Sequence, residues 1–200
     1  GAARLLRADQ VVKSARGCSH VHLAPMSPSK VATIITKLRR EQPDTIVSVN
    51  TWEGYMRSRG SRELLREIAR SSNFFIVNEG EIKKVTGMSD ISWAARQLES
   101  RQLVVTLGDL GAVYVKEGQL RFIPAPVGIA GDLVDTTGAG DAWCGAFLGA
   151  YSLTGSLEQS VTAASIVSAL KCRGWDFSKL LELRFQTVED LVDYVVRLRG

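Results

Sequence analysis

One stretch of this sequence carries the residue types that proteins use to hold and transfer a phosphate group, the run D-T-T-G-A-G-D at residues 135–141. The acid and the two threonines that open it favour turns and helix caps, and the small and apolar residues after it are typical of a buried helix. The first N–H groups of a helix have no partner inside it, and the peptide dipoles add positive charge there. Because Gly138 and Gly140 have no side chains, a phosphoryl group can reach those amides.

Asp141 adds a carboxylate at the edge of the same pocket. Phosphoryl transfer needs hydrogen-bond donors that stabilise the phosphoryl group and, beside them, a base that accepts the proton of the attacking hydroxyl. The plain alternative is that the glycines make a turn and that Asp141 is a first-turn acid favoured by the helix dipole, and the length of the string argues against it. Two other phosphate loops are excluded, because no Gly-Lys-Ser/Thr occurs and Trp143 stands where a dinucleotide fingerprint needs its third glycine.

The string resembles the C-terminal signature of the ribokinase-like (PfkB) family of carbohydrate and nucleoside kinases. The resemblance implies an ATP-dependent phosphotransferase that moves the γ-phosphoryl group to a hydroxyl of a sugar or nucleoside, with ATP and magnesium as cofactors. It implies that Asp141 is the catalytic base. It also implies that the backbone of Gly138, Ala139, Gly140 and Asp141 is the anion hole.

A second motif, N-E-G-E at residues 78–81, follows an apolar strand pattern. The carboxyl ends of parallel strands open onto the ligand crevice, and magnesium prefers oxygen ligands and retains much of its water. A helix N-cap explains the same residues equally well. The motif resembles the Asn-x-x-Glu of the family, which implies that Asn78 helps to bind the nucleotide and that Glu81 positions magnesium through water.

A third motif is the turn T-L-G-D-L-G-A at residues 106–112, whose glycines permit a tight hairpin turn. It is similar to the family's Thr-x-Gly-x-x-Gly turn, which implies nucleotide binding by Thr106, Gly108 and Gly111. The resemblance further implies a monovalent cation, potassium, near the anion hole. The corresponding positions are Asp135, Thr137, Ala169, Cys172, Gly174 and Ser178.

Composition narrows the class of protein. Two hundred residues, 45% of them hydrophobic and 23% charged, predict one domain over residues 1–200. The alternation of strand and helix patterns predicts that this domain is of the α/β class. Three widely separated cysteines and the lack of a secretory signal or a long apolar run predict a cytoplasmic protein that binds no membrane. The net charge of +4 suits anionic ligands, but the basic residues are interspersed with acids, so no nucleic-acid partner is expected.

Strand patterns alternate with helix patterns along the chain. Strands are expected at residues 19–23, 45–49, 73–77 and 103–107, with helices between them, which predicts parallel crossovers. A hairpin is expected over residues 113–124, and helices after Gly140, over residues 156–170 and over 188–198, with Gly174 as a left-handed cap. The resemblance implies a three-layer αβα ribokinase-like fold, with a mainly parallel sheet, helices on both faces and the hairpin at one edge.

In the family, a glycine-rich first signature and a small β-sheet lid precede the region that the resemblance covers, and no such segment is present here. The chain is then expected to be either a fragment of a longer kinase or an unusually short relative. Residues 1–16, which have the pattern of the tail of a larger architecture, favour the fragment. A non-catalytic nucleotide-binding module is one alternative. A pyridoxal or hydroxymethylpyrimidine kinase of the same fold is another, although Asp141 argues against the pyrimidine type. The acceptor is not encoded in any motif, and the resemblance allows a homodimer.

Overall fold

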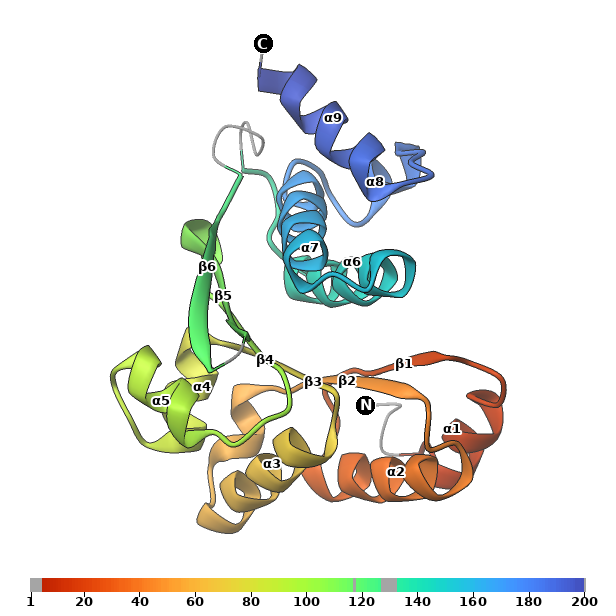
Figure 1. Ribbon diagram of the computed structural model, residues 1–200, viewed down its shortest axis with the longest axis vertical. Coiled ribbons are helices and arrows are strands. Elements are labelled where there is room, and N and C mark those ends of the chain that lie inside the picture. Colours follow the sequence, from red (N-terminus) through yellow and green to blue (C-terminus); the bar gives the residue numbers. More distant parts are fainter. Residues whose placement is uncertain (1–4, 117, 127–132, 200) are drawn as a thin grey trace. The chain divides into compact units, whose positions relative to one another are not determined.

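The computed structural model of the chain describes residues 5–116, 118–126 and 133–199. Its internal contacts divide the chain into two compact units, one formed by Gly1–Leu107 and Val113–Arg121 and the other by Gly108–Ala112 and Phe122–Gly200. Six strands form a sheet in the order β1-β2-β3-β4-β5-β6 (Figure 1). The pairs β1–β2, β2–β3 and β3–β4 are parallel. The predicted α/β class with a mainly parallel sheet is therefore confirmed.

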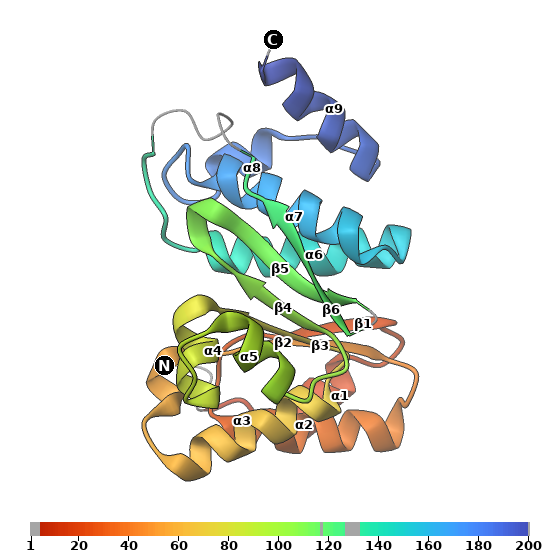
Figure 2. The same ribbon diagram turned by 60° about the vertical axis from the view of Figure 1, so that its left-hand side comes forward.

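Strands and helices alternate through the first unit. Its elements are α1 (Ala8–Ser14), β1 (His20–Leu23), α2 (Pro28–Glu41), β2 (Ile46–Asn50), the 3₁₀ helix η2 (Glu53–Met56), α3 (Arg59–Ser71), β3 (Phe74–Asn78), α4 (Glu79–Thr86), α5 (Ile91–Gln97) and β4 (Leu103–Thr106). Helices α1, α2 and α3 lie side by side along the same face of the first strands (Figures 1 and 2). The four strands predicted between residues 19 and 107 are present, with ends shifted by no more than one residue.

The apolar residues of this unit bury both faces of the parallel strands. Val47, Val49, Phe75 and Val77 belong to the same core as the helices. Their sequence neighbours Phe74, Ile76 and Val104 point to the opposite face and are also buried. A strand buried on both sides reads as a continuous apolar run, which is why F-F-I-V could be recognised from the sequence.

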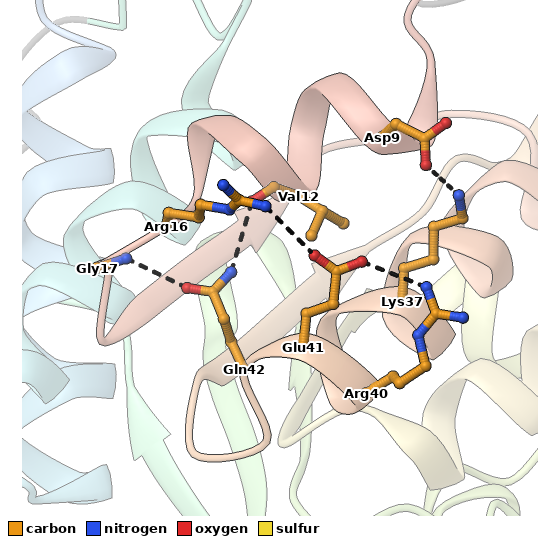
Figure 3. Close-up of polar contacts among 8 residues, drawn as sticks. All are labelled: Asp9, Val12, Arg16, Gly17, Lys37, Arg40, Glu41 and Gln42. Carbon is orange, nitrogen blue, oxygen red and sulfur yellow. Dashed lines mark hydrogen bonds and ion pairs between the residues drawn. The ribbon is translucent and has the colours of Figure 1, made fainter.

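Helix α1 is fixed to the end of α2 by a cluster of polar contacts (Figure 3). The Gln42 side chain accepts a hydrogen bond from the Gly17 amide (3.2 Å) and donates one to the Val12 carbonyl (3.5 Å). Lys37 pairs with Asp9, and Glu41 pairs with Arg16 and Arg40. Exposed ion pairs contribute little, so the buried Val12 side chain supplies most of the attachment.

The second unit contains η3 (Gly108–Leu110), α6 (Ala139–Thr154), α7 (Leu157–Lys171), α8 (Ser178–Glu182) and α9 (Val188–Arg199). Strands β5 (Gly111–Lys116) and β6 (Gln119–Pro124), the predicted hairpin, contribute residues to both units. Helices α6 and α7 pack against each other along their length. Trp143 stacks on Phe147 with ring centroids 5.4 Å apart, and its indole N–H donates to the Ser165 hydroxyl of α7 (3.3 Å). None of the described helices is both long and apolar enough to cross a membrane.

The prediction of Gly174 as a left-handed cap is wrong. Helix α7 has a right-handed C-cap at Cys172, and the left-handed residue of this turn is Asp176, with a φ of 53°. A Cβ at Gly174 would lie 2.7 Å from Cγ of Lys179 in α8. The glycine is therefore required by the close approach of a later helix rather than by its own backbone angles.

Candidate active site

The N-terminus of α6 presents open backbone donors. Gly138 is its N-cap and adopts a left-handed conformation with a φ of 77°, which glycine reaches without steric cost. The Ala139 amide donates a hydrogen bond to the Thr136 carbonyl (3.1 Å) and so closes the turn that precedes the helix. The amides of Gly138, Gly140 and Asp141 donate no hydrogen bond to any other described residue. Three of the four amides expected to form the anion hole are therefore available to a ligand.

The two glycines differ in what surrounds them. A Cβ placed on Gly138 would lie 3.0 Å from Cζ of Phe177, whereas a Cβ on Gly140 would have no neighbour within 4 Å. Phe177 thus lines one side of the helix mouth, and the Gly140 side faces open space. Close approach to the backbone is possible from that side.

Asp141 lies in the first turn of α6 and is exposed. Among the described residues, no ion pair and no side-chain hydrogen bond engages its carboxylate. The side chain is therefore available to accept a proton from a hydroxyl group that reaches the helix mouth.

The loop before α6 is held by the end of α7. The Cys172 carbonyl accepts hydrogen bonds from the amides of Val134 (2.9 Å) and Asp135 (3.3 Å). The Lys171 ammonium donates to the Asp135 carbonyl (2.9 Å) and to its carboxylate (2.8 Å), while the other carboxylate oxygen accepts from the Thr137 amide (2.9 Å). Lys171, and after it Thr137, lowers the pKa of Asp135 to about 2.

Sequence reasoning missed Lys171. The sequence signal that could have indicated its role is a single lysine in the last turn of a helix whose other buried positions are small or apolar. In the structure the Lys171 side chain is completely buried. Its partner lies 36 residues earlier in the chain, so local pattern gives no indication of the pair.

The residues expected to bind a monovalent cation are only partly brought together. Asp135, Thr137 and Cys172 share the hydrogen bonds just described. The Ser178 hydroxyl lies 3.7 Å from where a Cβ of Gly174 would be, but it donates to the Trp175 carbonyl (2.9 Å). Ala169 packs on the apolar cluster between α7 and α9.

In the first unit, Asn78 and Glu81 cap α4 reciprocally. The Asn78 side-chain oxygen accepts from the Glu81 amide, and the Glu81 carboxylate accepts from the Asn78 amide, both at 2.9 Å. Glu81 is 6% exposed, and this burial raises the pKa of its carboxyl group against the opposing effect of the Asn78 hydrogen bond. Thr106 is the register partner of Asn78 on β4, so both polar residues end neighbouring strands.

The donor set at this strand end suits magnesium only as part of a nucleotide complex. The described residues contain no cluster of three or more His, Cys, Asp or Glu side chains that could hold a metal ion. Magnesium often keeps its waters and takes one carboxylate together with substrate phosphates, and Glu81 and Asn78 fit that role.

The two glycines of the 106–112 turn have different roles in the structure. A Cβ on Gly111, where φ is 125°, would lie 2.1 Å from the Ile123 carbonyl oxygen of β6. Gly111 is therefore needed for the hairpin, which the Ala125 amide also closes on the Leu110 carbonyl (3.0 Å). Gly108 has a φ of 63° and no neighbour within 4 Å of a Cβ, which leaves its surface open to a ligand.

Comparisons with known proteins show the family of the chain. The model of the pfkB family carbohydrate kinases matches residues 6–174, which include all of the candidate site residues except Ser178. The chain belongs to the pfkB family. This confirms the resemblance drawn from the D-T-T-G-A-G-D string.

Individual relatives within the family are distant. A cytidine kinase of Thermococcus kodakarensis is 33% identical over 143 residues, which are 70% of this chain and 50% of that protein. A deoxyribokinase of Salmonella typhi is 32% identical over 67% of this chain and 44% of its own length. The chain thus spans about half the length of these relatives.

Solved structures share the fold. A protein from E. coli, whose structure contains ATP and Mg²⁺, superposes with a TM-score of 0.75 over 97% of this chain and 64% of its own, at 18% sequence identity. At this identity the likeness shows the fold and not the substrate. The expected ribokinase-like fold is confirmed by it.

Proposed function

We propose that the protein containing this chain is an ATP-dependent kinase that transfers the γ-phosphoryl group to a hydroxyl of a sugar or nucleoside. The observation that carries the proposal is the set of open amides at the N-terminus of α6 beside an unengaged carboxylate, within a chain of the pfkB family. The relatives named as cytidine kinase and deoxyribokinase support a nucleoside or sugar acceptor.

In this proposal Asp141 accepts the proton of the attacking hydroxyl. The amides of Gly138, Gly140 and Asp141 bind the charge on the transferred group, helped by the dipole of α6. Asn78, Thr106, Gly108 and Gly111 contribute to nucleotide binding, with Gly111 acting through the hairpin that it permits. Magnesium, when bound with the nucleotide, neutralises phosphate charge, and Glu81 would hold it through water.

The substitution Asp141→Asn tests the base. General base catalysis contributes about 10²- to 10⁴-fold, so kcat should fall by that factor while nucleotide affinity stays within about 3-fold. Glu158→Gln is the matched control, because Glu158 is also an exposed first-turn acid, at the start of α7. If Asp141 serves only the helix dipole, both variants will lose a similar small amount of stability and neither will lose turnover.

A non-catalytic nucleotide-binding module is the second candidate, since the chain spans only half of its relatives. The natural protein should be screened with pentoses, hexoses, nucleosides and vitamin precursors. Phosphorylation of a sugar or nucleoside supports the proposed kinase. Nucleotide binding without transfer to any acceptor supports the module, and transfer only to pyridoxal or a pyrimidine supports the related kinases of the same fold.

A further inference from the structure

A buried ammonium group lies beside the candidate anion hole, and the proposed reaction does not use it. The Lys171 side chain has no exposed surface, and its ammonium donates to the carbonyl (2.9 Å) and the carboxylate (2.8 Å) of Asp135. Burying a charge is costly unless it is paired and hydrogen-bonded, and lysine ordinarily stays at the surface. Its place in the fold therefore calls for a specific role.

The two oxygens of Asp135 connect Lys171 to the helix mouth. One carboxylate oxygen accepts from Lys171 and the other accepts from the Thr137 amide, one residue before the left-handed Gly138. The carbonyl of Cys172, the next residue after Lys171, binds the amides of Val134 and Asp135. The end of α7 thus sets the course of the loop that leads to the open amides of α6.

The same atoms fail as a site for a monovalent cation. Potassium would need several free oxygen ligands, but the Asp135 carbonyl and carboxylate face the Lys171 ammonium, and the Cys172 carbonyl is engaged by two amides. A second positive charge within a few ångströms of the ammonium would also be repelled. The residues therefore do not fit the potassium ion that the family resemblance implies.

We infer that the Lys171 ammonium is the resident cation of the 134–138 loop, a positioning residue that holds the anion hole in place and makes the protein independent of potassium. This inference rests on the proposed function for its effect on turnover. Its effect on cation binding does not depend on the acceptor or on catalysis.

The first test uses the unaltered natural protein. Thermal unfolding and turnover are measured in potassium, sodium and tetramethylammonium chlorides at one ionic strength. We expect the melting temperature and kcat to be the same in all three salts. A higher melting temperature or kcat in potassium would overturn the inference without any variant being made.

The second test replaces the cation. Lys171→Ala removes the ammonium and leaves space lined by the Asp135 oxygens, whereas Lys171→Met removes the charge and keeps most of the volume. We expect both to lower kcat at least 10-fold. Potassium or ammonium chloride should restore kcat in Lys171→Ala several-fold, tetramethylammonium chloride should not, and no salt should restore Lys171→Met.

The melting temperature gives a readout that does not need catalysis. The melting temperature of Lys171→Ala should be higher in potassium chloride than in tetramethylammonium chloride, because only its loop has space for the ion. The melting temperatures of the natural protein and of Lys171→Met should be the same in both salts. Full kcat in Lys171→Met, or a folded Lys171→Ala with no response to potassium, would refute the role. If the natural protein phosphorylates nothing while this pattern of melting temperatures appears, the proposed function fails and the assignment of Lys171 stands. If the variants do not fold, the salt series on the natural protein decides.

Discussion

Asn78 and Glu81 each satisfy the backbone amide of the other, at 2.9 Å, across the first turn of α4. The same two residues are those that we propose to bind the nucleotide and magnesium. The helix cap and the binding role are therefore compatible, because the capping bonds use Oδ1 of Asn78 and Oε2 of Glu81 and leave the Asn78 side-chain NH2 group and the Glu81 Oε1 outside the cap. A substitution at either residue therefore affects both the stability of α4 and the proposed binding site, unless the new side chain preserves the cap.

Asn78→Ala is expected to destabilise the protein by about 1 kcal/mol, because the Glu81 amide loses its acceptor. Asn78→Asp keeps an acceptor oxygen at the helix N-terminus, so its free energy of unfolding should stay within about 0.5 kcal/mol of that of the natural protein. Urea denaturation of both variants measures the difference. Equal stability of the two would show that the cap contributes nothing.

Substitution by alanine should change the stability of the protein differently at the two glycines of the α6 N-terminus. Gly138→Ala places a side chain at a φ of 77° and 3.0 Å from Phe177, so a loss of about 1 to 2 kcal/mol from the backbone alone is expected. Gly140→Ala meets no neighbour and removes a helical glycine, so stability should stay constant or rise by up to about 1 kcal/mol. Its methyl group should nevertheless obstruct the phosphoryl group and reduce kcat. Thermal unfolding and turnover of the same two preparations check this, and an unimpaired Gly140→Ala enzyme would count against the anion hole.

The contrast between these glycines shows where sequence reasoning ends. Apolar runs located β2, β3 and β4, because burial on both faces leaves a local signature, and β1 could be located although most of it is only partly buried. The position of Phe177 beside Gly138, and of Lys171 beside Asp135, depends on contacts between segments 36 or more residues apart. No period or spacing encodes such contacts, so the motif was readable while its supporting residues were not. The short helix α8, and with it the close approach of Lys179 to Gly174, was missed for a different reason, because its 5 residues are too few to show a helical period.

Gly111 and Gly108 separate a structural role from a binding role within one turn. Gly111→Ala should cost about 2 to 5 kcal/mol, because the φ of 125° is strained for alanine and the methyl group would collide with the backbone of β6. Gly108→Ala meets no atoms and should cost about 1 to 2 kcal/mol for its left-handed backbone. Nucleotide affinity should fall in Gly108→Ala under conditions where the variant is fully folded. Calorimetric titration with ATP measures it, and similar stability losses in both variants would contradict the hairpin role of Gly111.

Low pH should lower the free energy of unfolding of the protein, because Asp135 becomes protonated. Lys171, and secondarily Thr137, lowers the pKa of this carboxyl group from 3.8 to about 2, so the folded state binds its proton less readily than the unfolded state. The stabilisation is therefore complete above about pH 4 and is lost as the pH falls through about 2. Asp135→Asn removes this titration, so its free energy of unfolding should depend less steeply on pH between 4 and 2 than that of the natural protein, although it is lower at pH 7. Urea midpoints across this range measure the slope, with Asp193→Asn on the exposed side of α9 as the control. The same slope in Asp135→Asn and in the natural protein would mean that Lys171 and Asp135 are not paired in solution.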